Sequence, residues 1–285
     1  MTDAGHDTRP TRVDAHPGED QIAALAATEP RVSFDEGVDF DAAVTAAVAA
    51  IRRDGMVVLD DLVDTAVIAQ CRSEVEAAYP ELATPDRERN YGPYTGRHCM
   101  PMVLDGTLAD RALMLPRAYS AIAKAMLGER YMVDSIGLLV AVPGAPDQIA
   151  HRDGHLFPEV NLEPMLPTFA LACSMPLVRM DVVSGRTAFW RGSHRKGKAT
   201  GPHDLTPVVD PGSALIWDFS TYHCGLANTG TAPRPTIFTV LSREWWVEMH
   251  PPEAVRYEKM LMRRSVHAAL SKAEQHRFHR ATLVD

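Results

Sequence analysis

The spacing of apolar residues changes partway along the chain. In the first part they recur with the period of an amphipathic helix, as Phe40, Val44, Val48 and Ile51 do. This helical period covers three segments, namely residues 40–53, 65–79 and 117–127. From Tyr131 onward, apolar residues instead form short runs separated by Pro, Gly, Asn and Asp, which is typical of successive strands and turns.

The order of these elements predicts an α+β fold. Closely spaced strands favour a β-sandwich or barrel, and we place this β-core at about residues 131–247. A helical period returns over residues 252–280, so helices are expected before and after the core. Residues 1–33 are polar and show no period, and we expect a partly disordered tail there. Residues 34–285 then form a single domain.

Charge and cysteine content narrow the class of protein. The formal net charge is -8 and no long run of Lys and Arg occurs, so we expect neither nucleic acid nor a membrane as a partner. The four cysteines lack Cys-x-x-Cys spacing, which argues against a disulfide scaffold and a structural zinc site. The N-terminal segment has no apolar signal region and no stretch of about 18 apolar residues is present, so we expect a cytoplasmic protein.

Candidate metal ligands begin in the first part of the expected β-core. His151 and Asp153 stand two residues apart, and on a strand such side chains point to the same face. A second histidine, His223, follows the apolar run of a later strand. Two histidines and one carboxylate form the facial triad of non-haem iron(II) oxygenases. Three protein ligands leave the other positions of the ion open for a cosubstrate and dioxygen.

An arginine indicates which cosubstrate could be used. Arg234 stands 11 residues after His223, at the start of another expected strand. An arginine inside a barrel needs an anionic partner, and a guanidinium pairs well with a carboxylate such as the distal one of 2-oxoglutarate. A cupin-like metal isomerase, or a dioxygenase without this cosubstrate, would use a similar triad but would not need Arg234. A non-catalytic binding protein is a third hypothesis, and the intact triad argues against it.

Four passages together resemble the phytanoyl-CoA dioxygenase family. His-Arg-Asp at residues 151–153 matches the family's His-x-Asp, and residues 184–195 resemble its segment containing Gly-Ser-His. Residues 211–230 resemble its strand, turn and distal histidine, and Arg234 stands at the usual spacing. The likeness spans roughly residues 51–241.

This resemblance implies a double-stranded β-helix, which is a jelly-roll core like that of cupins, with flanking helices. It also implies iron(II), 2-oxoglutarate and dioxygen, and Thr187 matches a threonine that contacts the cosubstrate in several relatives. The sequence departs from the family pattern at Ser184, Arg191 and Gly225, where Asn, Pro and a polar residue are usual. Related halogenases have a small residue in place of the triad carboxylate, so the presence of Asp153 disfavours halogenation.

The substrate is less well defined by the sequence. No basic cluster suits the phosphates of coenzyme A, and we expect a medium-sized, largely apolar small molecule of secondary metabolism. The expected reaction is hydroxylation of a C–H bond, with desaturation, epoxidation and rearrangement as variants. Several relatives are dimers, which leaves a homodimer as one state to test. The candidate substrate contacts are Tyr94 and Arg97 in an irregular, lid-like stretch, together with Phe157, Met175 and Trp190.

Overall fold

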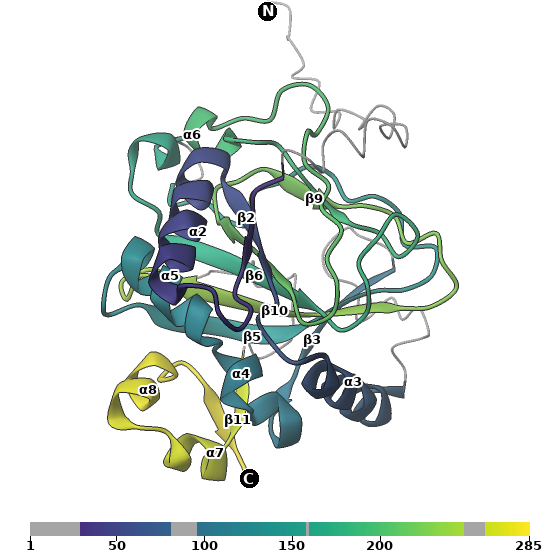
Figure 1. The fold of residues 1–285 in the computed structure, drawn as a ribbon, viewed down its shortest axis with the longest axis vertical. Coiled ribbons are helices and arrows are strands. Elements are labelled where there is room, and N and C mark those ends of the chain that lie inside the picture. The colour runs from purple at the N-terminus through teal and green to yellow at the C-terminus, as the bar shows by residue number, and fades with distance from the viewer. Residues whose placement is uncertain (1–28, 81–95, 158–159, 248–259) are drawn as a thin grey trace, which may run out of the picture.

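The computed structural model describes residues 29–80, 96–157, 160–247 and 260–285 (Figure 1). The three predicted N-terminal helices are confirmed as α2 (Phe40–Asp54), α3 (Thr65–Ala78) and α5 (Arg117–Leu127). Local chemistry sets the ends of α2. The Asp39 carboxylate accepts hydrogen bonds from the amides of Asp41 and Ala42, and Gly55 ends the helix at a φ of 90°.

The described residues form a sheet of seven strands that carries most of the fold. Its strands, in spatial order, are β1 (Arg31–Ser33), β2 (Met56–Asp60), β8 (Ala214–Asp218), β6 (Ala170–Pro176), β10 (Arg234–Ser242), β5 (Met132–Ala141) and β3 (Arg97–Pro101). Neighbouring strands are antiparallel except β1 and β2. The irregular stretch predicted around Arg97 is wrong for β3, and β1 takes up the last residues of the predicted tail, most of which lies outside the described residues. Both strands pair with partners that are distant in sequence, so no local pattern marks them.

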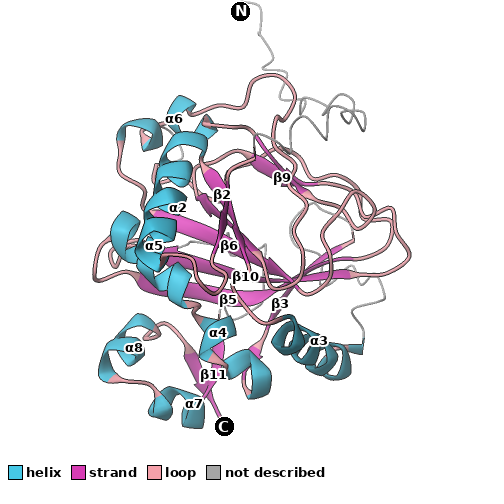
Figure 2. Cartoon of the chain, viewed as in Figure 1, coloured by secondary structure: helices cyan, strands magenta, loops and turns pink. Residues whose placement is uncertain are grey.

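A smaller sheet lies against the seven-stranded one. It pairs β7 (Thr187–Phe189) with β9 (His223–Gly225) in antiparallel fashion. The Phe189 ring lies 5.5 Å from that of Trp217 in β8, which links the two sheets through an apolar core. Figure 2 shows long loops around β9 and the helices α2 and α5 together along the opposite side of the large sheet.

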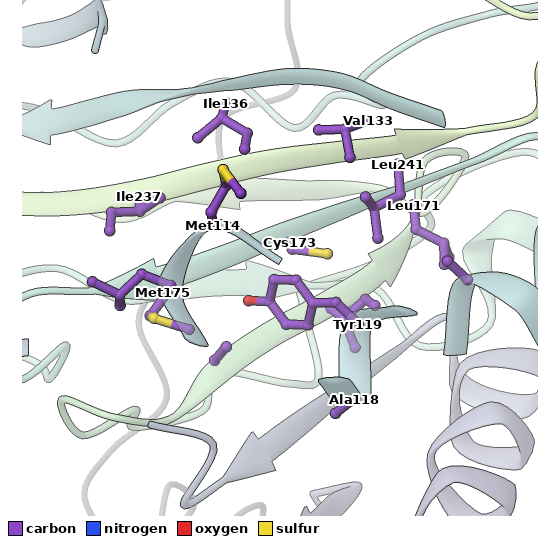
Figure 3. Packing of buried hydrophobic residues seen from close by; sticks show 14 of the residues in the cluster. Met114, Ala118, Tyr119, Val133, Ile136, Leu171, Cys173, Met175, Ile237 and Leu241 are labelled. Carbon is purple, nitrogen blue, oxygen red and sulfur yellow. The ribbon is translucent and has the colours of Figure 1, made fainter. Parts of the chain in front are cut away.

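The period of two in the strands gives the large sheet two different faces. In β6, Leu171, Cys173 and Met175 belong to the core that includes the helices, whereas Ala172 and Ser174 face the small sheet. Figure 3 shows Tyr119 of α5 packed among these helix-facing core side chains. Met175 therefore lies in this core, and its assignment as a substrate contact is wrong.

The remaining elements lie outside the two sheets. They are β4 (Val103–Leu104), β11 (Leu261–Arg263) and β12 (Thr282–Val284), which form a small parallel sheet, the helices α4 (Arg111–Met114), α6 (Ser193–Lys196), α7 (Arg264–Ala269) and α8 (Lys272–Arg277), and the 3-10 turns η3 (Gly106–Ala109) and η4 (Glu163–Met165). The predicted helical segment at residues 252–280 is only partly confirmed, because two short helices follow a strand there and residues 252–259 lie outside the described ranges. Within those ranges, no helix has the length and apolar character that crossing a membrane requires.

Candidate metal centre

Three side chains converge where the two sheets meet. His151, Asp153 and His223 each offer a ligand atom, and these atoms all lie within 4.8 Å of one another. The backbones of His151 and His223 exchange two hydrogen bonds of 2.9 Å, which form an isolated antiparallel bridge. Asp153 lies in a bend, where its amide donates to the carbonyl of Phe219 at 3.2 Å. The expected strand over residues 151–153 is therefore wrong, and tertiary contacts bring the two side chains together.

The backbone orients both imidazole rings. Nδ1 of His151 lies 2.8 Å from the carbonyl oxygen of Ile149, and Nδ1 of His223 lies 3.0 Å from that of Thr221. A carbonyl oxygen can only accept, so each Nδ1 carries the hydrogen. Nε2 of each ring then faces the Asp153 carboxylate, whose Oδ1 lies 3.3 Å from His223 Nε2 and 4.0 Å from His151 Nε2.

Burial and mutual charge tune these three groups. Burial, together with nearby His223, lowers the pKa of His151 to about 4. Burial opposes ionisation of Asp153, but the charge of His223 and its hydrogen bond outweigh it, so the pKa of Asp153 is lowered. Burial also opposes protonation of His223, yet the Asp153 carboxylate raises the pKa of that imidazole. At neutral pH the cluster thus offers an ionised carboxylate and a neutral His151, which are forms that bind a metal.

The cluster opens into a cavity of about 130 Å³ between the sheets. One face of β10 contributes Arg234, Thr236, Phe238 and Val240, in keeping with the period of a strand. The further lining residues are Arg97 and Cys99 of β3, Leu139 of β5, Ala172, Cys173 and Ser174 of β6, Thr187 of β7, Trp217 of β8 and Gly225 of β9, with Gln148, Phe219 and Thr239.

Arg234 and Arg97 bring positive charge into this cavity. Arg234 is only 3% exposed, and its guanidinium donates to the carbonyl of Ser184 and the hydroxyl of Thr236. Burial, and then the charge of Arg97, lowers the pKa of Arg234 to about 9. Among the residues described, no carboxylate forms an ion pair with Arg234. A buried cation in this position favours an anionic ligand.

Arg97 is not part of a lid over the cavity. It begins β3 and is almost fully buried, and its Nη2 donates to the carbonyls of Pro146, Gly225 and Leu226. Its assignment to an irregular lid is therefore wrong, although it does line the cavity. Tyr94, the other expected lid residue, lies outside the described residues.

Gly225 and Gln148 are cavity residues that the sequence patterns do not predict, since Gly225 is marked only by its departure from the family pattern. The amide of Gly225 donates to Gln148 Oε1 at 2.7 Å. A Cβ atom at Gly225 would lie 2.7 Å from that oxygen and 3.1 Å from Nη1 of Arg97. Glycine is therefore required because Arg97 and Gln148 occupy the space of a side chain. Only the tertiary structure could reveal this, since Arg97 is distant in sequence.

Two further substrate candidates do not line the cavity. Phe157 is 51% exposed, and Trp190 packs against Ala188, Cys224 and Leu226 while its indole donates to the carbonyl of Gly201. Trp190 is therefore a core residue. The aromatic rings that do line the cavity, Trp217, Phe219 and Phe238, are not among the expected substrate contacts. Their apolar strands are recognisable in the sequence, but the direction of each side chain depends on how the strands pair.

The segment with Gly-Ser-His has a structural role. Nη1 of Arg191 lies 3.0 Å from the buried Asp54 carboxylate, and Nε2 of His194 lies 3.3 Å from the carbonyl of Arg52. These contacts join the segment to the end of α2. They explain why arginine occupies the position of the family's usual proline, and they show that His194 stabilises a turn and does not join the triad.

Two histidines and one carboxylate at a cavity form the donor set of a non-haem iron oxygenase. The sequence model of the phytanoyl-CoA dioxygenase family matches residues 51–236. This match covers more than half of the chain, and the chain therefore belongs to the phytanoyl-CoA dioxygenase family. The resemblance inferred from the four sequence passages is confirmed.

The curated relatives include fungal dioxygenases. Dioxygenase trt7 of Aspergillus terreus is 24% identical over 188 residues, which are 62% of this chain and 66% of the relative. The iron/alpha-ketoglutarate-dependent dioxygenase ausU of Aspergillus calidoustus is 25% identical over 194 residues, which are 65% of each chain. The chain thus spans slightly less than two thirds of the length of these two relatives.

Solved structures share the fold. SnoN, a non-haem alpha-ketoglutarate-dependent epimerase from nogalamycin biosynthesis, matches with a TM-score of 0.53 and 21% identity, over 71% of this chain and 84% of SnoN. AviO1 from Streptomyces viridochromogenes matches with a TM-score of 0.55 and 20% identity, over 73% of this chain and 97% of AviO1. SnoN has also been solved with Fe3+, alpha-ketoglutarate and a nogalamycin compound. At these identities the likeness supports the mixed helix-and-sheet oxygenase fold.

Proposed function

We propose that this chain is an iron(II)- and 2-oxoglutarate-dependent oxygenase that oxidises a C–H bond of a largely apolar small molecule. The observation that carries this proposal is a shared cavity. A His-Asp-His cluster and the buried Arg234 line the same space, and no carboxylate of the described residues pairs with that arginine. The two sheets that enclose this space form a jelly-roll core in this proposal, within one domain that includes β1.

His151, Asp153 and His223 would hold the iron. The chemistry of the donors fits iron(II), because two neutral imidazoles and one carboxylate leave a net positive charge on the ion and open positions beside it. Bound iron supplies dioxygen activation coupled to oxidative decarboxylation of 2-oxoglutarate. In the default reaction, substrate, 2-oxoglutarate and dioxygen give hydroxylated substrate, succinate and carbon dioxide. Desaturation, epoxidation and rearrangement are variants of the same oxidation.

Arg234 would bind the distal carboxylate of 2-oxoglutarate, and Thr187, which lines the same cavity, would also contact the cosubstrate. The charge of Arg97 contributes to lowering the pKa of both His151 and Arg234. Arg97 is therefore near both the metal cluster and the arginine that would bind the distal carboxylate of the cosubstrate. We assign Arg97 and Gln148 to the part of the cosubstrate nearest the metal. Two arginines with a single lining carboxylate match a cosubstrate that carries two carboxylates.

The apolar part of the cavity would exclude water and accept the substrate. Phe219, Phe238 and Val240 line it together with Leu139 and Ala172. Apolar walls strengthen the ionic contacts of the cosubstrate and limit side reactions with solvent. This lining supports a largely apolar substrate. SnoN acts in nogalamycin biosynthesis, which supports a role for this chain in secondary metabolism.

The test is anaerobic titration of the iron(II)-loaded protein with 2-oxoglutarate, followed by the weak visible charge-transfer band of the complex. Arg234→Met should raise the dissociation constant about 30- to several-thousand-fold, since losing a buried charge-assisted pair costs roughly 2–5 kcal/mol. Arg186→Met is the matched control, because Arg186 is equally buried but does not line the cavity. Its dissociation constant should stay close to that of the wild type.

The cupin-like alternative predicts a different result. An isomerase or a dioxygenase without this cosubstrate would bind iron but show no band with 2-oxoglutarate. Equal binding of pyruvate and 2-oxoglutarate would contradict the assigned role of Arg234, because pyruvate has no distal carboxylate. Loss of the band in Arg186→Met to the same extent as in Arg234→Met would show that the effect is one of general destabilisation.

A further inference from the structure

The carboxylate of Asp153 receives a hydrogen bond from a tryptophan. Nε1 of Trp217 donates to Oδ2 of Asp153 at 2.9 Å. Trp217 lies in β8, between Met56 of β2 and Ala172 of β6, and is almost fully buried. Its ring lies 5.1 Å from the ring of His223. Strand pairing and ring packing therefore hold the indole in one orientation beside the metal cluster.

This hydrogen bond makes the two carboxylate oxygens different. Oδ1 is the oxygen that lies 3.3 Å from His223 Nε2 and 4.0 Å from His151 Nε2. Oδ2 is the oxygen that accepts the hydrogen bond from the indole N–H of Trp217. An indole N–H can only donate, and a hydrogen bond to an ionised oxygen is among the strong ones. Oδ1 is thus directed to the point that both imidazoles share, and Oδ2 is held away from it.

Each of the three candidate ligands is oriented by a hydrogen bond to a group outside the cluster. Backbone carbonyls orient His151 and His223, and a side chain orients Asp153. Outer partners of this kind fix the direction of a ligand and tune its affinity for the metal. The Trp217 contact is the one that a side-chain substitution can remove.

We infer that Trp217 is a positioning residue that keeps Asp153 a ligand through one oxygen. This inference rests on the proposed function. An octahedral ion with three protein donors has three positions left, which accommodate a bidentate 2-oxo acid and dioxygen. A carboxylate bound through both oxygens would take one of these positions. By holding Oδ2, the indole would keep a position of the bound ion open for dioxygen.

The test uses Co(II) as the probe, because its visible spectrum responds to the ligands and to their geometry around the ion. Trp217→Phe keeps an aromatic ring in the core but removes the N–H donor. It should weaken Co(II) binding about 10- to 100-fold and change the positions and shape of the visible bands, as expected when a second carboxylate oxygen replaces another ligand of the ion. Trp190→Phe is the matched control, since it removes an indole hydrogen bond of 2.8 Å to Gly201 at a site that does not line the cavity. Its affinity and spectrum should match those of the wild type.

A double-mutant cycle separates positioning from packing. If Trp217 acts through the carboxylate, Trp217→Phe should change Co(II) affinity in the wild type but leave it unchanged in an Asp153→Ala background. An equal loss in both backgrounds would overturn the inference, because it would place the effect in packing. Thermal unfolding of each variant confirms that the compared proteins are folded.

The outcomes also distinguish this inference from the proposed function. If the wild type binds no Co(II), both the metal site and the role of Trp217 are overturned. If the wild type binds Co(II) and Trp217→Phe retains its affinity and spectrum, only the role of Trp217 is overturned. The cosubstrate titration with Arg234→Met then remains a separate test of the oxygenase.

Discussion

The two faces of the seven-stranded sheet carry different kinds of residue although they share the same strands. In β6, Leu171 and Met175 pack toward the helices, while Ala172 and Ser174 line the cavity. One face buries apolar area and stabilises the fold, since burying a Leu contributes roughly 1.5–3 kcal/mol. The other face contains the buried Arg234, which costs stability unless an anionic ligand pairs with it. Residues that stabilise the fold and residues that line the cavity are therefore one position apart along the same strand.

The largest expected effect is on the cavity face. Asp153→Ala should reduce affinity for iron(II) more than about a hundredfold, because the charged member of the candidate ligand set is lost and outer-partner losses alone cost about 10- to 100-fold. The fold should persist, since Asp153 lies in a bend and not in the helix-facing core. Metal analysis measures the iron content, and circular dichroism checks that the fold persists. Unchanged iron content would contradict the candidate site.

A substitution on the helix-facing side of the sheet should lower stability and leave metal affinity nearly unchanged. Leu171→Ala should lower the free energy of unfolding by about 2–5 kcal/mol, because it leaves a void in the core between β6 and the helices. Iron affinity of the folded protein should change little. Denaturant unfolding measures the free energy of unfolding, and metal titration at low temperature measures the iron affinity. A parallel loss of metal affinity in the folded state would show that the two faces are not independent.

A smaller effect is expected at a glycine inside the cavity. Gly225→Ala should cost about 1–3 kcal/mol of unfolding free energy, as overpacking does, because its Cβ would meet Gln148 Oε1 and Nη1 of Arg97. It should also weaken 2-oxoglutarate binding if these two side chains contact the cosubstrate. Gly144→Ala is the steric control, since nothing lies within 4 Å of a Cβ there, although its φ of 79° adds backbone strain. Equal cosubstrate affinity in wild type and Gly225→Ala would contradict the assignment of Arg97 and Gln148.

The smallest effect concerns the stability cost of the buried arginine. Arg234→Met should raise the free energy of unfolding of the ligand-free protein by about 1 kcal/mol, since it removes a buried cation with no carboxylate partner among the described residues. The pKa of Arg234 is lowered to about 9, so at neutral pH the cation and its cost are both present. With metal and 2-oxoglutarate added, the wild type should become the more stable of the two proteins, because only the wild type is stabilised by binding the cosubstrate. Thermal unfolding with and without these ligands measures the stability of both proteins. If Arg234→Met stays the more stable protein in their presence, the cosubstrate site is contradicted.

The sequence by itself determined what depends on neighbouring residues. The helices α2, α3 and α5 follow from apolar period and from end signals such as Asp39 and Gly55, which act within one or two turns. The candidate donor set could be predicted as well, because metal chemistry restricts the residue types and the family motif gives their order. The residue pattern alone is therefore enough to select His151, Asp153, His223 and Arg234 as candidates.

The tertiary structure decided the contacts between segments that are distant in sequence. It turned an expected loop into strand β3 and moved Arg97 from a lid into the cavity, because β3 exists only through its pairing with β5. It joined Trp217 to Asp153, 64 residues away in sequence, and made Gly225 necessary through the bulk of Arg97. The direction of a strand side chain reverses with every residue, so the lining of the cavity depends on strand register, which pairing between distant segments sets.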